Sequence, residues 1–318
     1  MRAVTFEQFG APEVLHVGTM PDPHPKAGEV VIQVAASTVN PTDTLMRAGK
    51  QSALMDDLKP PFIAGMEFAG HVHMLGEAVE GLSVGEPVMG VVNPRRSAGG
   101  AHAEFICVPA ASVAPLRASA DLTEAATIPM NGLTALIVME SLEPLLGDTV
   151  LVTGAAGAVG GYVIQLAKSA GFRVLADAKT DDVELVRRLG AEIIVPRGDG
   201  FAAAVTQACP DGVDAVVDCA LLGDRVSSLV RKGGIAISLR RANAIRDSRL
   251  RTAYVSVTDR MTDAKALARL SELFSSGILS PRVAMRLPMS EAPQAHKLVE
   301  QGGVRGRVVL TFNGCCKP

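Results

Sequence analysis

Short apolar runs alternate with helix-length segments in the second half of the chain. The run Val150–Val152 leads into a glycine-rich turn, after which apolar side chains recur at Val159, Val163 and Leu166 with the spacing of a helix. Later apolar runs lie at Phe172–Ala176, Ile193–Val195, Ala215–Val217 and Ile235–Ser238. Continuous apolar strands separated by helices are typical of a parallel sheet covered on both faces, so the pattern predicts a doubly wound α/β domain.

The first 120 or so residues follow a different pattern, without helix–strand alternation. Glycine and proline turns separate short apolar runs, and one short helix is expected at Pro41–Ala48. Strands are predicted at Ala3–Phe6, Glu29–Ala36, Phe68–Leu75, Pro87–Val92 and Ala103–Val108. This half is therefore predicted to be a separate, mostly antiparallel domain.

The remaining elements connect and complete these two patterns. Further helices are predicted from Thr123 into Pro129 and at Gly132–Leu142, Asp181–Leu189, Asp263–Ser275 and Glu291–Gln301. Two more strands are predicted, at Val283–Leu287 and Arg307–Phe312. We expect the last stretch to return to the β-rich domain.

The turn after Val152 has the composition of a phosphate-binding loop. Its glycines, Gly154, Gly157 and Gly160, are spaced G-x-x-G-x-x-G, a relative of the dinucleotide fingerprint. Glycine lets a ligand approach the backbone closely, and the helix that follows presents unpaired N–H groups to an anion. The same glycines also suit a close helix–strand crossing without a ligand, but the alternating strands and helices around them favour a dinucleotide.

Composition excludes several classes of protein. The chain has 318 residues, 48% hydrophobic and 20% charged, as in a soluble enzyme of two domains. A net charge of −2 argues against binding to nucleic acid or an anionic membrane, and no apolar run is long enough to span a bilayer. A strand-like, acid-containing N-terminus argues against a signal peptide, and five cysteines without C-x-x-C spacing favour the cytoplasm.

Several motifs together resemble a known family. They are Ala36–Asp43, Pro61–Gly70 with Gly81–Val88, Gly99–Phe105, Asn131–Ala135 and the ending Gly303–Leu310. With the glycine-rich turn, they resemble the zinc-independent quinone oxidoreductase branch of the medium-chain dehydrogenase/reductase superfamily. The resemblance covers nearly the whole chain.

The resemblance implies a two-domain α/β fold. A GroES-like β-rich catalytic domain would span residues 1–122, completed by residues 286–318, and a Rossmann cofactor domain would span residues 123–285. The cofactor would lie in a cleft outside the carboxyl ends of the parallel strands. Relatives of this kind are usually homodimers, so a homodimer is expected here.

The resemblance also bears on metal binding. The zinc-dependent relatives have a cysteine at the position of Asn40 and a histidine at that of Met66. An amide and a thioether do not replace thiolate and imidazole around zinc, so no zinc is expected. His71 and His73 alternate on a strand and are interpreted as ordinary strand residues.

The choice of nicotinamide cofactor depends on the end of the second parallel strand. By resemblance, the acid that selects NAD falls on Ala178, and the cations Lys179 and Arg197 lie near it. Cations without an acid accommodate the 2′-phosphate of NADPH, which is favoured over NADH. Asp177 opposes this assignment, and its role stays open at the sequence level.

The resemblance also implies which residues contact the ligands. Asn40 and Thr134 would face the nicotinamide, although Asn40 could instead only set the turn before Pro41. The expected cofactor-binding residues are Asn40, Thr134, Gly154, Ala155, Gly157, Ala158, Val159, Gly160, Lys179, Arg197, Cys219, Leu239 and Arg305. The expected substrate pocket is formed by Asn40, Leu45, Met46 and Asn131.

The implied reaction is hydride transfer from NADPH to a small-molecule quinone or α,β-unsaturated carbonyl. Leu45 and Met46 occupy a region where many relatives carry a tyrosine, and His102 is interpreted as a surface or packing residue. No catalytic side chain is therefore predicted, and solvent is expected to supply the proton.

Two alternative functions stay open: a stand-alone enoyl reductase of a biosynthetic pathway, and a cofactor-binding protein with little turnover. Relatives usually have a glycine at the position of Arg240, and this difference favours the cofactor-binding protein with little turnover.

Overall fold

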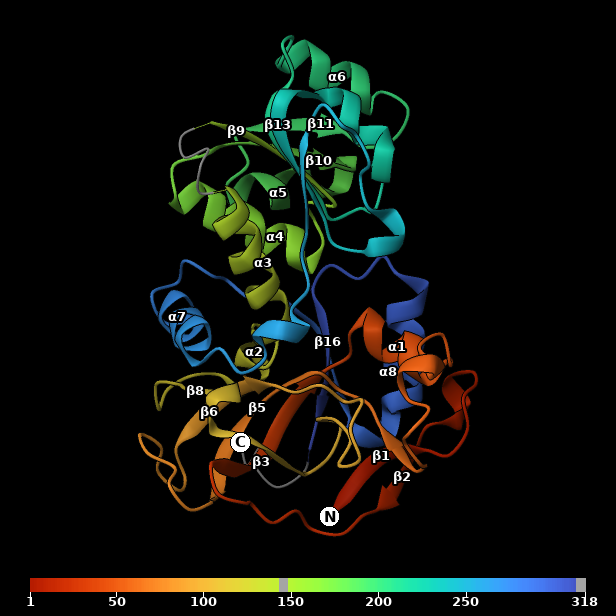
Figure 1. Cartoon of the computed structure of the whole chain (residues 1–318), viewed down its shortest axis with the longest axis vertical. Helices are drawn as coiled ribbons and strands as arrows, with labels where there is room; N and C mark the ends of the chain where they lie inside the picture. Colours follow the sequence, from red (N-terminus) through yellow and green to blue (C-terminus); the bar gives the residue numbers. More distant parts are fainter. Residues whose placement is uncertain (143–147, 313–318) are drawn as a thin grey trace. The chain divides into compact units, whose positions relative to one another are not determined.

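The structure is a computed structural model that describes residues 1–142 and 148–312 (Figure 1). The described residues form two units. Unit 1 takes its residues from Met1–Met130, Thr258–Gly277 and Pro281–Pro318, and unit 2 from Asn131–Val257 and Ile278–Ser280. The last part of the predicted segment 286–318, from residue 313 onward, lies outside the described residues.

Unit 2 is built on a six-stranded sheet in which all neighbouring strands are parallel. Its order is β11-β10-β9-β12-β13-β14, which is 3-2-1-4-5-6 when the strands are numbered along the chain. The strands are β9 (Thr149–Thr153), β10 (Arg173–Ala178), β11 (Ile193–Pro196), β12 (Val213–Asp218), β13 (Val230–Ser238) and β14 (Arg251–Tyr254). The prediction of a doubly wound parallel sheet is confirmed.

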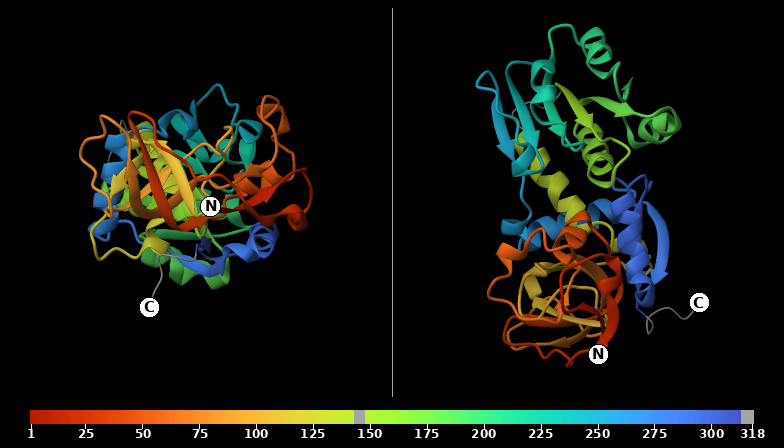
Figure 2. Two further views of the ribbon diagram at one scale, coloured as in Figure 1. Left: turned by 90° about the horizontal axis from the view of Figure 1, so that it is seen from below. Right: turned by 90° about the vertical axis from the view of Figure 1, so that its right-hand side faces the viewer.

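Helices cover both faces of this sheet (Figures 1 and 2). On one face lie α4 (Ala158–Ser169) and α5 (Val183–Leu189), and α6 (Phe201–Ala208) lies on the other. The central strands are apolar on both sides because both faces are covered, as Leu151 and Val216 illustrate by being fully buried. The edge strand β14 is largely exposed and polar, which explains why apolar patterning did not predict it.

Unit 1 contains a larger, mostly antiparallel sheet of order β15-β16-β3-β5-β6-β8, with β7 paired to β3. Its strands are β3 (Glu29–Thr38), β5 (Glu67–Leu75), β6 (Pro87–Val91), β7 (Phe105–Pro109), β8 (Val113–Pro115), β15 (Val283–Pro288) and β16 (Arg307–Thr311). A smaller sheet contains β1 (Arg2–Phe6), β2 (His16–Thr19) and β4 (Phe62–Ile63). The last strand, β16, pairs antiparallel with β3, so two strands far apart in the sequence are neighbours in one sheet.

The longer helices of unit 1 are α1 (Pro41–Arg47), α2 (Leu122–Ala125), α7 (Ala264–Ser275) and α8 (Ala292–Gln301). Helix α3 (Pro129–Leu142) begins at the end of unit 1 and continues into unit 2. Single 3₁₀ segments are η1 (Pro12–Val14), η2 (Ser52–Leu54), η3 (Ala110–Ser112), η5 (Thr180–Asp182), η6 (Gly223–Leu229), η7 (Arg241–Asn243), η8 (Thr258–Arg260) and η9 (Met289–Glu291). Within the described residues, no helix combines the length and the apolar character needed to cross a membrane.

Helix α7 marks a difference from the domain boundaries expected from the sequence. Those boundaries put it in the cofactor domain, whereas the observed division puts it in unit 1. The reason is local packing: α7 lies against β8, and the Ser271 hydroxyl donates a hydrogen bond of 2.6 Å to the carbonyl of Pro115. Amphipathic patterning predicted the helix but carried no information about which unit it covers.

A basic cluster is buried in unit 1 between α1 and α8. The His296 ring is fully buried and lies edge-on to the buried His102 ring, with 5.9 Å between ring centroids. The buried guanidinium of Arg47 pairs with Glu300 of α8. Burial, followed by the effects of His102 and Arg47, lowers the pKa of His296 well below 6.5. The imidazole of His296 is therefore neutral in the folded protein near neutral pH.

This burial predicts an acid-dependent loss of stability. Because the unfolded state binds a proton near pH 6.5 and the folded state resists it, the contribution of His296 is present above pH 6.5 and falls below it. The expected slope is at most about 1.4 kcal/mol of unfolding free energy per pH unit. Urea unfolding of the natural protein and His296→Leu from pH 7.5 to 5.0 measures it. Equal pH slopes in the two proteins would contradict the prediction.

Candidate functional site

The glycine-rich loop connects β9 to α4 in unit 2, and each of its three glycines has a distinct structural reason. Gly154 has a φ of +65°, a conformation that side chains other than glycine adopt rarely. Gly157 is the N-cap of α4. At Gly160, a Cβ atom would lie 2.5 Å from the carbonyl oxygen of Gly154, so only glycine allows the helix to approach the loop this closely.

The first turn of α4 presents unpaired backbone donors. The N–H of Gly157 donates to the carbonyl of Gly154 at 2.9 Å, and the first helical bond runs from the N–H of Gly161 to Gly157 at 3.0 Å. The N–H groups of Ala158, Val159 and Gly160 therefore precede the intrahelical bonds. Together with the positive end of the helix dipole, these groups suit a phosphate or diphosphate.

Asp177, at the end of β10, holds this loop in place. Its side chain is nearly fully buried, and Oδ1 accepts a hydrogen bond of 3.1 Å from the N–H of Ala155. Oδ2 forms an ion pair of 2.6 Å with Nε of Arg197. Both oxygens are thus engaged by the protein, which explains the residue whose role the sequence left open.

A second buried acid, Asp218, connects the loops that follow β9 and β12. Its Oδ1 accepts from the hydroxyl of Thr153 at 2.7 Å and its Oδ2 from the N–H of Gly223 at 2.8 Å. The Thr153 hydroxyl also accepts from the N–H of Ala220 at 3.0 Å. These strands flank the point where the strand order reverses, where dinucleotides bind in such sheets. Asp218 was not predicted as a site residue from the sequence, although an acid at the end of an apolar strand is a usable signal.

A cavity of about 540 Å³ lies beside these loops, at the carboxyl ends of β10, β11 and β12. Its lining combines apolar and charged side chains, including Asp177, Arg197, Phe201, Ala220, Leu222 and Arg225. The cavity is large enough for a sizeable part of a nucleotide and has cations where an anionic group would bind. Arg225 was not among the residues predicted from the sequence.

The other residues of unit 2 that were predicted to bind cofactor are dispersed around this edge. Lys179 follows β10 and is exposed, and Leu239 follows β13 and is half-buried. Cys219 follows β12, and burial, then the carboxylates of Asp218 and Asp177, raises the pKa of its thiol, so it is neutral. Next to Leu239, Arg240 is exposed.

Asn131 and Thr134 lie three residues apart on α3 and therefore on one face of that helix. Thr134 is half-buried, whereas Asn131 is buried. The amide nitrogen of Asn131 has no hydrogen-bond partner among the residues that the structure describes. A buried donor without a partner is costly, so it is a good candidate for contact with a bound molecule.

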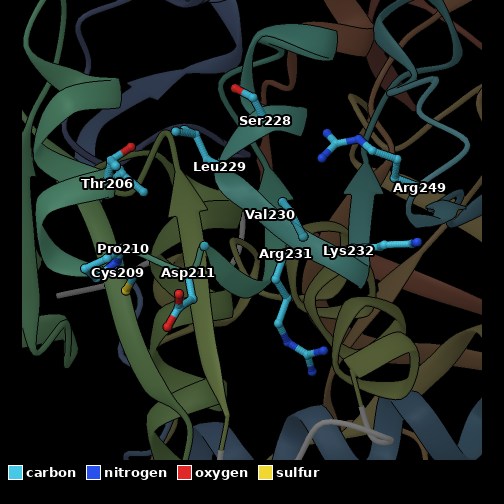
Figure 3. A pocket seen from close by; sticks show the side chains of 12 residues that line it. Thr206, Cys209, Pro210, Asp211, Ser228, Leu229, Val230, Arg231, Lys232 and Arg249 are labelled. Carbon is cyan, nitrogen blue, oxygen red and sulfur yellow. The ribbon is translucent and has the colours of Figure 1, made fainter.

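A second cavity in unit 2, of about 220 Å³, lies at the opposite edge of the sheet, near the starts of β12 and β13 (Figure 3). It also has basic side chains, Arg231, Lys232 and Arg249, but Figure 3 shows them pointing in different directions. Arg231 pairs with Asp214, and Arg249 pairs with Asp247. This cavity therefore lacks the convergent cations of an anion site.

In unit 1, Asn40 belongs to a buried polar network. Its Nδ2 donates to Oε1 of Glu67 at 3.0 Å, and its Oδ1 accepts from Nη2 of Arg307 at 2.7 Å. The same guanidinium nitrogen donates to Thr38 at 3.0 Å and forms an ion pair with Glu67 at 2.7 Å. The Glu67 carboxylate also accepts from the N–H of Met130 at 2.8 Å. Neither Glu67 nor Arg307 was identified from the sequence, although an acid inside an apolar strand is a signal for such a pair.

This network decides whether the position suits a metal. The side chain of Asn40 is engaged by Glu67 and Arg307, and the sulfur of Met66 accepts a hydrogen bond of 3.0 Å from Thr42. An amide, a thioether and an adjacent guanidinium cation do not form a zinc ligand set. Among the described residues, no three His, Cys, Asp or Glu side chains gather in a metal-binding arrangement. These residues do not fit zinc.

Three other expected residues of unit 1 occupy different environments. Leu45 is half-buried on α1, whereas Met46 is 1% exposed and packs in the hydrophobic core of the unit. Arg305 lies in an exposed loop and donates to the carbonyl of Gly303 at 2.9 Å. His102 is fully buried, and its Nε2 lies 3.1 Å from the carbonyl oxygen of Thr38. His102 is thus a packing residue of unit 1.

Comparisons with known proteins agree with this architecture. Residues 26–118 match the alcohol dehydrogenase GroES-like domain, and residues 189–310 match a zinc-binding dehydrogenase domain. A chloroplastic NADPH-dependent alkenal/one oxidoreductase of Arabidopsis thaliana is 30% identical over 98% of this chain and 79% of its own length. The chain belongs to the medium-chain dehydrogenase/reductase superfamily.

Solved structures of this superfamily superpose on the whole chain. The quinone oxidoreductase of Coxiella burnetii is 28% identical, with a TM-score of 0.87 over 98% of this chain and 99% of its own. A mycobacterial protein solved in complex with NADPH is also 28% identical, with a TM-score of 0.83 over 98% and 100% of the two chains. The medium-chain dehydrogenase/reductase fold expected from the sequence motifs, a GroES-like domain with a Rossmann domain, is confirmed.

The buried pair of Glu67 and Arg307 gives a testable prediction. Removing one charge leaves the other buried without compensation, so Glu67→Gln and Arg307→Leu should each lower the unfolding free energy by about 3–5 kcal/mol. The double variant should lose less than the sum of the two. Arg2→Gln, which breaks the more exposed pair with Glu104, is the control and should cost about 1 kcal/mol or less. Urea unfolding measures all four variants, and single-variant losses no larger than the control would contradict the prediction.

Proposed function

We propose that this protein is a zinc-independent, NADPH-dependent oxidoreductase that transfers a hydride to a quinone or an α,β-unsaturated carbonyl. The observation that carries the proposal is the first turn of α4, where the N–H groups of Ala158, Val159 and Gly160 precede the intrahelical bonds. The glycine-rich loop before this turn is held by Asp177, and Asp218 bonds to Thr153 at its start. Family membership supports it, as do relatives named for alkenal/one and quinone reduction. The poor fit of Asn40 and Met66 to zinc supports the zinc-independent assignment.

In this proposal, the residues of unit 2 hold the cofactor. The N–H groups of Ala158, Val159 and Gly160 would bind its diphosphate, beside the backbone of Gly154, Ala155 and Gly157. The cations at the cavity favour NADPH over NADH, as does a relative named for NADPH dependence. Thr134, Lys179, Arg197, Cys219 and Leu239 complete the proposed set in this unit. Asn40 and Arg305 stay predictions from the family resemblance.

The bound nicotinamide supplies the hydride, so the chain itself needs no nucleophile. Its residues bind, orient and keep water from the reacting atoms. Negative charge then builds on the substrate oxygen, and the unpartnered amide of Asn131 is the donor proposed to stabilise it. Solvent would deliver the proton. Leu45 stays a predicted pocket residue, whereas Met46 packs in the core of unit 1 and is not available to a substrate.

The roles of the two units and the setting of the enzyme remain part of the proposal. Unit 1 would form the catalytic domain and unit 2 the cofactor domain. We propose a homodimer in the cytoplasm that acts on a small molecule and binds neither nucleic acid nor membrane, in keeping with the net charge of −2.

Steady-state oxidation of NADPH with a simple quinone and with an enone tests the proposal. Oxidation that depends on the acceptor is the expected result. A strong preference for enoyl thioesters would favour an enoyl reductase instead. Tight cofactor binding without acceptor-dependent oxidation would favour a cofactor-binding protein with little turnover, for which the arginine at position 240 gave the motive.

Gly157→Val tests the diphosphate assignment directly. Gly157 is exposed, and the only atom near an added Cβ is the carbonyl oxygen of Gly154 at 3.0 Å, so a side chain would mainly obstruct an approaching ligand. NADPH affinity should fall by at least about tenfold, with the fold retained. Fluorescence titration, together with the thermal shift that NADPH induces, measures this fall in affinity.

Gly160→Ala is the contrast variant. Its added Cβ would clash with backbone, so this substitution should also lower the melting temperature. Unchanged affinity in Gly157→Val would show that the loop is misassigned.

A further inference from the structure

The cavity beside the glycine-rich loop contains two arginines from different segments of unit 2. Arg197 follows β11, and Arg225 lies in η6, the 3₁₀ segment that follows β12. Phe201, Ala220 and Leu222 provide apolar surface between them. An apolar cavity with guanidinium groups at its rim has the chemistry to hold an aromatic base and an adjoining phosphate.

The acid at this site is not available to a ligand. Asp177 is buried, with one oxygen on the N–H of Ala155 and the other on Nε of Arg197. The Asp177 side chain is only 3% exposed, so a ribose 2′-hydroxyl would reach this carboxylate poorly. Asp199 also lines the cavity, but it is exposed, so water screens its charge.

The ion pair with Asp177 fixes the guanidinium of Arg197 but uses only one of its nitrogens, Nε. The side chain of Arg197 stays 33% exposed. The two terminal nitrogens have no hydrogen-bond partner within residues 1–142 and 148–312. A guanidinium anchored at Nε leaves its outer edge to donate two hydrogen bonds to one phosphate.

Arg225 is the less constrained of the two cations. It is exposed, and its Nε lies 3.5 Å from the carbonyl oxygen of Leu222. In the described part of the chain, no carboxylate lies within ion-pair distance of it. Its positive charge is therefore uncompensated, unlike that of Arg197, and it faces the same cavity.

We infer that Arg225 is a specificity-determining residue that binds the 2′-phosphate of NADPH together with Arg197. The inference rests on the proposed function and deepens it, since it names the cation that distinguishes the phosphorylated nucleotide from NADH. A 2′-phosphate carries up to two negative charges, so it is bound best by two cations. The carboxylate of Asp177 already offsets the positive charge of Arg197. Arg225 then supplies the charge that the engaged pair lacks.

The test compares the affinities of NADPH and NADH for the full-length protein and its variants by fluorescence titration. Arg225→Gln should weaken NADPH binding by roughly tenfold or more, as loss of a charge-assisted hydrogen bond does, and leave NADH binding unchanged. Arg225→Lys should retain part of the preference for NADPH. Lys232→Gln is the matched control, because it removes a cation from the same unit at the other sheet edge and should change neither affinity.

The possible failures are distinguishable. Equal weakening of NADPH and NADH by Arg225→Gln would place the guanidinium on the shared part of the nucleotide and overturn the inference. So would unchanged NADPH binding in that variant, while the proposed function would stand. A natural protein that binds neither nucleotide would overturn the proposed function and the inference with it.

Discussion

Two buried carboxylates determine the geometry of the loops at the carboxyl ends of β9, β10 and β12. Asp177 fixes the N–H of Ala155 and the guanidinium of Arg197, and Asp218 connects Thr153 to the loop after β12. The glycines leave this loop conformationally permissive, and without such anchors its backbone would lose entropy when a ligand bound. The anchors make the first turn of α4 a preformed site, which is the condition for placing a reactive nicotinamide accurately.

Arginine pairing has a similar consequence in both units. In unit 1, Arg307 compensates Glu67 and occupies the amide oxygen of Asn40 with a guanidinium, which disfavours a divalent cation there. In unit 2, Arg197 compensates the buried carboxylate of Asp177. In each case a buried acid is paired with an arginine at least 20 residues away in the sequence.

That distance explains what could be predicted from the sequence and what could not. Most strand positions, the glycine-rich loop and most helices follow from local periodicity and spacing, which report on neighbours along the chain. Glu67 meets Arg307, 240 residues later, and Asp177 meets Arg197 across two strand ends. No periodicity encodes such partners. The edge strand β14 and the contact of α7 with β8 were not predicted for the same reason. The exposure of a strand and the packing of a helix depend on tertiary neighbours.

The pairing of β16 with β3 also constrains the order of events during synthesis. Arg307 must find Asn40, 267 positions earlier, before the large sheet and its buried ion pair are complete. Every strand of the parallel sheet, in contrast, lies between residues 149 and 254. Unit 2 therefore has all its strands when the ribosome reaches α7, whereas the large sheet of unit 1 is complete only after β15 and β16 have been synthesised. The carboxyl end of β3, from Ala36 to Thr38, consequently lacks its β16 partner until β16 has been synthesised, whereas the rest of β3 pairs with β5 and β7.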